Sequence, residues 1–302
     1  MRFLISRFSS MGDVICTLPV AAALKAGHSD CEVAWIVDRR FASIVERCRA
    51  VDQVIVAEKQ FGNLKEQVRG LGEFDAALDM QGLLKSAIPV GLARAKTRLG
   101  YHWQREFSSL FSQAVKPDPS SIHIVDQYLD VARAAGGEAG FAEFALEPTP
   151  ADIKNVEAKV EGEGPLVVMN GGAGWASKRW PAENFAKVAD RLMNEGARVA
   201  FIGGPDGQEA FQEIQSHAQC RPIDLIGRTS LGELIALISQ SVMHLGGDTG
   251  STHLAAALKK PAFGLYLLTR PERSCPYGQI HRCHSLDPAV VAESMMQELK
   301  GC

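Results

Sequence analysis

The sequence predicts an α/β protein with two doubly wound, Rossmann-like domains, each built on a sheet of parallel strands. Short apolar runs alternate with helical patterns along the 302 residues, which indicates parallel strands covered by helices on both faces. The alternation occurs twice, on either side of a proline-punctuated segment at 146–150 that suits a linker. The chain is also long for one compact core and sufficient for two. We therefore expect one domain at 1–150 and a second at 151–302.

The individual elements follow from the local periodicity of apolar residues. In the first half we predict strands at 2–6, 31–37, 53–56 and 76–78, with helices at 10–26 and 61–72. In the second half we predict strands at 166–169, 199–203, 224–226, 242–245 and 262–265, with helices at 181–195, 206–218, 231–239 and 252–258. A final helix at 289–299 is compatible with packing back on the first domain.

Composition excludes several classes of protein. Hydrophobic residues make up 46% and charged residues 22%, as in ordinary globular proteins. The net charge of −3 argues against a nucleic-acid-binding protein, which usually carries a basic domain. No apolar run approaches the ~20 residues of a membrane span, and the apolar stretch at the N-terminus is too short for a signal peptide. We expect a cytoplasmic protein.

The seven cysteines do not indicate a disulfide framework or a zinc site. They are scattered and contain no Cys-x-x-Cys pair. The group formed by Cys275, His281, Cys283 and His284 has a spacing that matches no common zinc pattern. We interpret these four as loop residues.

Glycine-containing turns follow several of the predicted strands, at 11–13, 171–174, 203–205 and 246–253. Two doubly wound domains that face one another leave a central cleft at the carboxyl ends of their strands, where ligands bind. The turn at 246–253 runs directly into an Ala/Leu-rich helix, so backbone N–H groups and the positive end of a helix dipole converge there. Such a junction suits a phosphate or diphosphate, and a purely steric tight turn is the alternative.

Two charged residues beside these turns each have two possible roles. Asp13 comes directly after the first strand, where a carboxylate is either a general base or a group that stabilises the first turn of the next helix. Lys178 precedes a helix that Pro181 opens, and it either neutralises a phosphate or is a solvated surface charge.

The residues around the last glycine turn also allow alternatives. Asp248 could accept hydrogen bonds from ribose hydroxyls or cap the helix, and His253 could meet a phosphate or a backbone carbonyl. Ser230 and Glu233 form a Ser-x-x-Glu pattern, which favours a capping box. The chain has no Walker lysine motif and no Gly-x-Gly-x-x-Gly after its first strand, which argues against a phosphate-loop NTPase and a nicotinamide dehydrogenase.

Five motifs occur in a fixed order along the chain, at 7–14 with 17–19, 79–86, 177–181, 227–231 and 247–257. Together they resemble glycosyltransferase family 9, the ADP-heptose:lipopolysaccharide heptosyltransferases. The stretches at 81–86 and 103–107 are similar to the heptosyltransferase I branch, which adds the first heptose to a Kdo sugar.

The resemblance implies a GT-B fold, with an acceptor domain first and a nucleotide-sugar domain second, and an inverting single displacement. It assigns Asp13 as the catalytic base, with no metal and no other cofactor. The donor-binding residues it implies are Lys178, Thr229, Asp248, Thr249, Gly250, His253 and Gly174. The acceptor-side residues are Ser10, Lys85 and Arg105. The expected partners are ADP-heptose and a lipid A–Kdo acceptor at the inner-membrane surface, without nucleic acid or a stable protein partner. For the location, peripheral attachment to the inner face of the inner membrane is the alternative to a purely cytoplasmic protein.

The sequence departs from the family pattern at three places. Asn-Gly-Gly at 170–172 stands where His-Pro-Gly is usual, and 267–271 replaces a Gly-Pro-Thr-Asp-Pro-like segment. Gly207 occupies the position of a ribose-binding glutamate, for which Asp206 or Glu209 is the candidate substitute. These departures motivate two alternatives, a non-catalytic nucleotide-sugar-binding paralogue and a family member with another sugar donor. A nucleotide-sugar epimerase or dehydrogenase is a third, and it predicts NAD binding.

Overall fold

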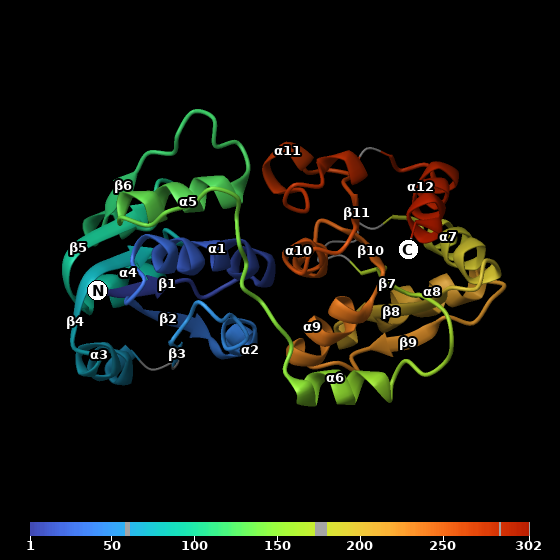
Figure 1. Ribbon diagram of the computed structural model, residues 1–302, viewed down its shortest axis with the longest axis horizontal. Coiled ribbons are helices and arrows are strands. Elements are labelled where there is room, and N and C mark those ends of the chain that lie inside the picture. Colours follow the sequence, from blue (N-terminus) through green and yellow to red (C-terminus); the bar gives the residue numbers. More distant parts are fainter. Residues whose placement is uncertain (58–60, 173–179, 284, 302) are drawn as a thin grey trace. The chain divides into compact units, whose positions relative to one another are not determined.

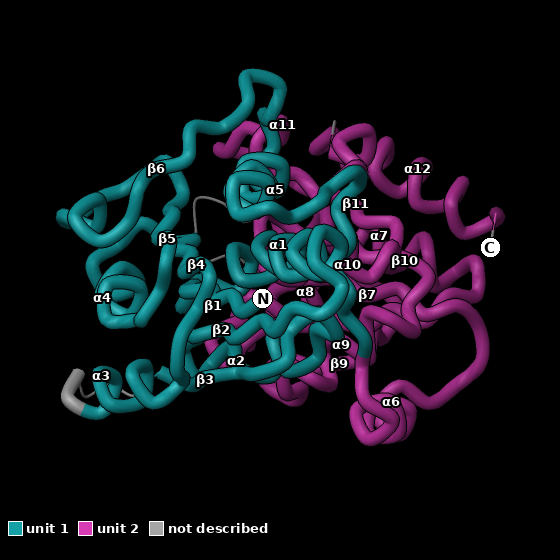
Figure 2. The backbone as a smooth tube through the Cα atoms, turned by 60° about the vertical axis from the view of Figure 1, so that its left-hand side comes forward, with its two compact units in different colours: residues 1–147 teal, residues 148–302 magenta. Residues whose placement is uncertain are grey.

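The chain forms two compact units, Met1–Glu147 and Pro148–Cys302 (Figure 2). The computed structural model describes residues 1–57, 61–172, 180–283 and 285–301 (Figure 1). Each unit contains one sheet in which all strand pairs are parallel, with helices between successive strands. This confirms the predicted α/β class.

The sheet of the first unit has six strands in the order β3-β2-β1-β4-β5-β6. The strands are β1 (Arg2–Ser6), β2 (Glu32–Asp38), β3 (Gln53–Ala57), β4 (Glu73–Asp79), β5 (Arg94–Tyr101) and β6 (Gln113–Val115). The helices are α1 (Met11–Gly27), α2 (Ala42–Val45), α3 (Phe61–Gly70), α4 (Leu84–Leu92) and α5 (Ile124–Ala134), with short 3₁₀ turns η1 (Arg39–Phe41) and η2 (Ser108–Leu110). The chain moves outward from β1 to β3 and then returns to β4 on the other side of β1, so the loops after β1 and β4 lie at the switch point of the sheet.

The second unit has a five-stranded sheet in the order β11-β10-β7-β8-β9. Its strands are β7 (Leu166–Asn170), β8 (Arg198–Gly203), β9 (Ile223–Ile226), β10 (Met243–Gly247) and β11 (Ala262–Leu265). Its helices are α6 (Pro150–Glu157), α7 (Ala182–Asn194), α8 (Gln208–His217), α9 (Leu231–Gln240), α10 (Gly250–Ala257), α11 (Pro271–Ser274) and α12 (Pro288–Lys300), with 3₁₀ turns η4 (Pro205–Gly207) and η5 (Ile280–Arg282). Here the switch point falls between β7 and β10, because β10 returns beside β7 after β8 and β9.

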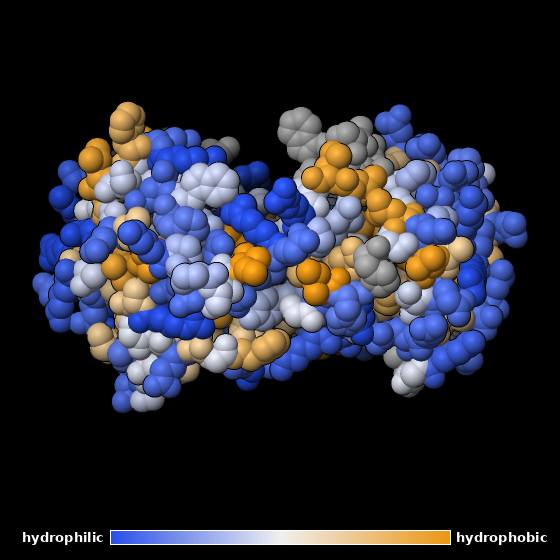
Figure 3. Space-filling view, turned by 90° about the horizontal axis from the view of Figure 1, so that it is seen from above, coloured by the Kyte–Doolittle hydropathy of each residue, from blue (hydrophilic) through white to orange (hydrophobic). Residues whose placement is uncertain are grey.

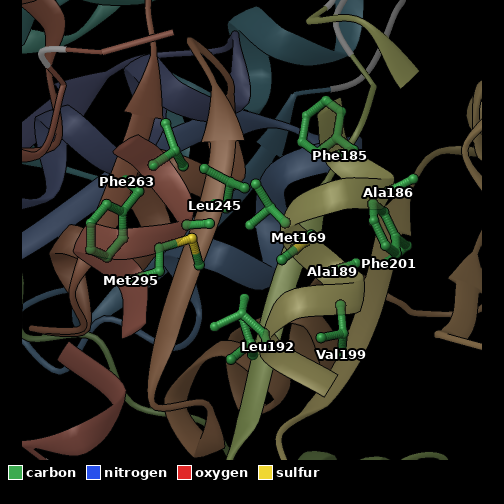
Figure 4. Packing of buried hydrophobic residues seen from close by; sticks show 14 of the residues in the cluster. Met169, Phe185, Ala186, Ala189, Leu192, Val199, Phe201, Leu245, Phe263 and Met295 are labelled. Atoms are coloured by element: carbon green, nitrogen blue, oxygen red, sulfur yellow. The ribbon is translucent and has the colours of Figure 1, made fainter. Parts of the chain in front are cut away.

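The core of the second unit includes the last helix of the chain. Met295 and Met296 of α12 are buried with Leu192 of α7 and Phe263 of β11 (Figure 4). The apolar face of this helix joins the core of the second unit, a placement that the sequence did not predict.

Hydrophobic side chains are visible on one face of the surface in Figure 3. On the face in Figure 3, hydrophilic side chains predominate and hydrophobic ones form separate patches.

None of the described helices is both long and apolar enough to cross a membrane. The six cysteines in the described ranges are free thiols.

Candidate functional site

The β1–α1 junction places Asp13 in the first turn of α1. Its Oδ2 accepts hydrogen bonds from the backbone N–H of Ser10 at 3.1 Å and from the Ser10 hydroxyl at 2.8 Å. Its Oδ1 lies 2.8 Å from Nη2 of Arg7. Asp13 therefore stabilises the start of α1, which is one of the two roles the sequence left open. Ser10 and Arg7 together hold both of its carboxylate oxygens.

Arg7 is a buried cation that sequence reasoning did not single out. It is 4% exposed, whereas the Asp13 side chain is 43% exposed. Its Nη1 donates to the carbonyl of Met80, and its guanidinium carbon lies 5.4 Å from the centre of the Tyr128 ring. Its Nε is buried and has no partner among the described residues. The only available signal was an arginine immediately after a buried strand, where the chain normally turns to solvent.

The charges of this ion pair stabilise each other. Burial raises the pKa of Asp13, but the positive charge of Arg7 and the hydrogen bonds from Ser10 and Arg7 outweigh it, so the net pKa lies below the ordinary value. Burial lowers the pKa of Arg7, and the neighbouring Tyr128 and Asp13 more than reverse that change. Asp13 is consequently ionised at neutral pH and able to accept a proton.

The β4–α4 turn fastens the loop that carries Arg7. Asp79 is fully buried, and its Oδ1 accepts from the backbone N–H groups of Gln81 at 3.1 Å and Gly82 at 3.0 Å. The Gln81 side chain in turn accepts from the backbone N–H of Phe8 at 3.0 Å. Burial raises the pKa of Asp79, while these hydrogen bonds partly oppose the rise. The two loops at the switch point are therefore one bonded assembly.

The same turn connects to the segment that contains Arg105. Gly82 has φ +69, and a Cβ there would lie 2.3 Å from the carbonyl oxygen of Trp103, so only glycine fits. The Gly82 carbonyl accepts from the backbone N–H of Arg105 at 2.8 Å. The Arg105 guanidinium lies 5.4 Å from the centre of the Trp103 ring.

The structure brings three of the predicted first-domain residues together. Ser10 bonds directly to Asp13, and Nζ of Lys85 donates to the hydroxyl of the neighbouring Ser9 at 3.0 Å. Arg105 connects to this group through the Gly82 turn rather than through its side chain. The candidate acceptor side thus consists of exposed polar groups around a well-bonded carboxylate.

The β10–α10 junction holds four of the predicted donor-binding residues, Asp248, Thr249, Gly250 and His253. Thr249 is the N-cap residue of α10, but it makes no side-chain capping bond to the helix. Its hydroxyl instead lies 3.0 Å from the hydroxyl of Ser251. Nε2 of His253 lies 3.7 Å from Oδ1 of Asp248. With no side-chain cap from Thr249, the first-turn N–H groups and the helix dipole are suited to an anion.

Neutral side chains hold this second junction in place. The Thr252 hydroxyl donates to the carbonyl of Gly247 at 2.7 Å and lies 3.4 Å from Nε2 of His244. His244 is fully buried, and burial lowers its pKa to about 3, so the imidazole is neutral. A Cβ on Gly246 would lie 2.9 Å from that Nε2 and 3.0 Å from the Thr252 hydroxyl, so this packing requires glycine.

Asn170, at a departure from the family pattern, has a structural role beside this junction. Its Nδ2 donates to the Ser251 hydroxyl at 2.9 Å, and its Oδ1 accepts from the backbone N–H of Gly172 at 3.0 Å. It ties the end of β7 to the first turn of α10. Sequence reasoning noted Asn170 only as a substitution and did not identify Ser251 or His244.

The remaining predicted residues lie elsewhere in the second unit or outside the described ranges. Thr229 is half-buried and follows β9, which β7 and β8 separate from β10. The Ser230–Glu233 capping box is confirmed, with bonds of 2.8 Å and 3.2 Å. Lys178 and Gly174 lie outside the described residues. In the described part of the chain, no three His, Cys, Asp or Glu side chains gather as metal ligands would.

Comparison with known families decides the class of protein. The model of glycosyltransferase family 9 (heptosyltransferase) matches residues 62–300. The chain belongs to glycosyltransferase family 9. The match includes four of the five motifs and the whole β10–α10 junction, and it confirms the resemblance to this family. The protein is therefore a glycosyltransferase.

Relatives of family 9 match nearly the whole chain. It is 26% identical over 285 residues to the lipopolysaccharide core heptosyltransferase OpsX of Haemophilus influenzae, covering 91% of this chain and 82% of that protein. It is 27% identical over 304 residues to lipopolysaccharide heptosyltransferase 1 of Escherichia coli K12, covering 92% of each. The structure of a family 9 glycosyltransferase from Veillonella parvula gives a TM-score of 0.88 at 20% identity, covering 100% and 98%. E. coli heptosyltransferase WaaC with ADP gives 0.78 at 23%, covering 100% and 99%, and the fold is GT-B.

Proposed function

We propose that this glycosyltransferase transfers a heptose from ADP-heptose to the Kdo-bearing inner core of lipopolysaccharide. The observation in this chain that carries the proposal is the β10–α10 junction, where the first turn of α10 has no side-chain cap from Thr249. The names of the relatives, lipopolysaccharide core heptosyltransferase and lipopolysaccharide heptosyltransferase 1, support the acceptor class. Solved relatives with ADP and with ADP-2-deoxy-2-fluoro heptose support the donor class.

The proposed reaction is a single displacement with inversion. The acceptor hydroxyl attacks the anomeric carbon, a new C–O bond forms, and the bond from that carbon to the diphosphate oxygen breaks. The hydroxyl proton passes to Asp13, and ADP leaves with the electron pair of the broken bond. Backbone N–H groups of α10, together with Lys178, stabilise the charge on the departing diphosphate, a contribution that is usually large in such reactions.

We further propose that the reaction needs no metal ion, because the helix terminus and Lys178 supply the positive charge that a metal would otherwise provide. Turnover measured with and without EDTA checks this directly. Unchanged turnover is the expected result, and recovery of a lost activity by added Mg²⁺ would refute the proposal.

Two experiments test the donor and the reaction. A thermal-shift series with ADP, UDP and GDP sugars identifies the donor, because a ligand that binds the folded state raises the melting temperature by mass action. We expect ADP-heptose to give the largest shift. A product assay with ADP-heptose and a Kdo-bearing acceptor then separates a catalyst from a non-catalytic paralogue, which the sequence departures at 170–172, 207 and 267–271 motivate. Binding without product would favour the paralogue.

We propose peripheral contact with the membrane that holds the acceptor. Phe107 and Leu110 are each 79% exposed. The backbone N–H of Leu110 donates to the carbonyl of Phe107 at 3.1 Å, and residues three apart in such a 3₁₀ turn lie on the same side. Trp103, half exposed, lies beside the Arg105 guanidinium, a combination suited to a lipid interface.

Sedimentation with vesicles of phosphatidylethanolamine and phosphatidylglycerol tests this surface. The double variant Phe107→Ser/Leu110→Ser should reduce the bound fraction. Phe141→Ser is the matched control, because Phe141 is in the same unit and equally exposed, at 79%. Equal losses from the two variants would contradict the assignment.

A further inference from the structure

The two oxygens of the Asp13 carboxylate have different surroundings. Oδ1 is paired with the guanidinium of Arg7, whose side chain is only 5% exposed. Oδ2 bonds to Ser10, an exposed residue at the start of α1. One oxygen is therefore held from the interior of the unit, and the other faces groups at the surface.

Both the guanidinium and the backbone of Arg7 are held by neighbouring groups. Nη1 donates to the carbonyl of Met80, the Tyr128 ring lies alongside, and the Arg7 carbonyl accepts from the indole N–H of Trp35 at 3.2 Å. The planar fork of an arginine keeps its donors in set directions, which a lysine ammonium does not. A fixed guanidinium thus fixes the position of Oδ1, which its Nη2 contacts at 2.8 Å.

We propose that Arg7 is the positioning residue for Asp13: by holding Oδ1 it directs Oδ2 to receive the proton of the acceptor hydroxyl. The inference rests on the proposed base role of Asp13. The Ser10 hydroxyl already donates to Oδ2 at 2.8 Å, which is the same type of bond that an acceptor hydroxyl would make. Arg7 does not touch the substrate in this scheme.

The charged and titratable groups around the pair come from four elements. Tyr128 is on α5, Asp79 ends β4, and Cys16 lies one turn along α1. Lys85 of α4 reaches the loop through Ser9. Within this set, Arg7 makes the direct ion pair with Asp13, so removing Arg7 changes the field on the carboxylate most.

Two Arg7 variants separate the effect of the positive charge of Arg7 from its effect on the placement of Asp13. The measurement is the pH dependence of kcat and of kcat/KM with ADP-heptose and a Kdo-bearing acceptor. Arg7→Met should move the acid limb upward by about 1 pH unit, because an adjacent opposite charge depresses a carboxyl pKa by about that amount or more. Its kcat above the limb should fall on the order of 10–10²-fold through misplacement of the base. Arg7→Lys should leave the limb near its original pH and still lose kcat, because the charge remains without the fork.

A second ion pair of the same unit supplies the matched control. Arg133 pairs with the buried carboxylate of Asp130 at 2.6 Å within α5. Arg133→Met should lower the melting temperature without moving the acid limb or kcat. The KM for ADP-heptose should stay unchanged in all three variants, because the proposed donor residues belong to the other unit.

The possible outcomes keep the two proposals apart. Turnover retained in Asp13→Asn would remove the base role, whatever the Arg7 variants do. An inactive Asp13→Asn beside Arg7 variants with normal kcat and an unmoved limb would overturn only the positioning role. If circular dichroism shows that Arg7→Met does not fold, Arg7→Lys decides the matter: wild-type kcat overturns the proposal, and a reduced kcat with an unmoved limb supports it.

Discussion

The β1–α1 and β10–α10 junctions share a local topology but differ in chemistry. Each follows an inner strand at the switch point of its sheet and begins a helix. At α1, the carboxylate of Asp13 already occupies the first turn and bonds to Ser10. At α10, Thr249 makes no side-chain capping bond. A carboxylate in the first turn neutralises the helix dipole and repels phosphate, whereas an uncapped turn attracts it. The two junctions therefore fit the proposed proton acceptor in one unit and the proposed anion site in the other.

The buried groups beneath the two junctions also differ. Under α1 the chain buries a charged arginine, 4% exposed, paired to the surface carboxylate. Under α10 it buries a histidine that its surroundings keep neutral. The first junction therefore depends on an ion pair, and the second depends on packing and on hydroxyl hydrogen bonds.

The largest expected effect comes from Asp13→Asn. If Asp13 is the base, kcat should fall on the order of 10²–10⁴-fold, the usual size of general-base catalysis. ADP affinity by calorimetry should stay unchanged, because the α10 junction belongs to the other unit. If the variant keeps turnover within tenfold of the original, Asp13 is not the base, and the β1–α1 junction then has no catalytic role to set it apart from the β10–α10 junction.

The same substitution has a structural consequence that needs its own control. Asn leaves the buried Arg7 without its charged partner, which destabilises a fold. The double variant Arg7→Met/Asp13→Asn removes both charges and should recover much of the melting temperature. Recovery of stability without recovery of turnover locates the loss in chemistry rather than in folding.

Much of the fold could be predicted because the inner strands are continuous apolar runs. β1 and β11 have the predicted bounds, and the other predicted strands are found with small shifts of their ends. The strand β5 (Arg94–Tyr101) was missed because its first five residues are polar or only partly buried, so they form no continuous apolar run. α6 was missed because the proline-rich linker ends at Thr149, whose hydroxyl and Asp152 form a capping box that begins the helix.

The candidate site was predictable where motif residues are adjacent in sequence and not where they meet through the fold. The residues at 248–253 form one turn, and Asp13 with Ser10 forms another. Arg7, Asn170 and His244 became visible only through contacts across strands, because Asn170 meets Ser251 and Arg7 meets Met80 over long sequence separations. Their positions along the sequence do not show which partners they meet.

Gly246→Ala tests the packing of the second junction. The new Cβ would lie 2.9 Å from Nε2 of His244, a buried ring with little room to move. We expect a loss of about 1–3 kcal/mol in the free energy of unfolding, typical of overpacking, together with weaker ADP binding. Gly247→Ala is the matched control, since its nearest new contact is 3.7 Å away. Equal destabilisation by the two variants would show that the close contact at Gly246 is unimportant.

The two junctions should respond to acid in different pH windows. The pKa of His244 is lowered from 6.5 to about 3, so the unfolded chain binds a proton that the folded chain excludes. Stability is therefore present above pH 6.5 and falls as the pH drops below it, by up to about 1.4 kcal/mol per unit. The pKa of Asp13 is lowered from 3.8, so its contribution is present above that value and is lost only at lower pH.

Urea unfolding from pH 7.5 to 4.5 measures the first of these windows. The variant His244→Gln keeps a polar side chain near Thr252 but does not titrate, so its stability should depend less on pH than that of the original protein. Asp13→Asn should leave the slope in this window unchanged. An identical slope in His244→Gln and the original protein would assign the acid sensitivity to other groups.

The smallest expected effect is that of Asn170→Asp, which places a carboxylate beside the first turn of α10. Oδ1 still accepts from the backbone N–H of Gly172, but the bond donated to Ser251 is lost. A like charge near the diphosphate should weaken ADP binding by about 5–10-fold, equivalent to about 1 kcal/mol. Adenosine, which lacks the diphosphate, provides the control and should bind both forms equally in calorimetry. A comparable loss for adenosine would mean that the substitution disturbs the turn itself and not its interaction with an anion.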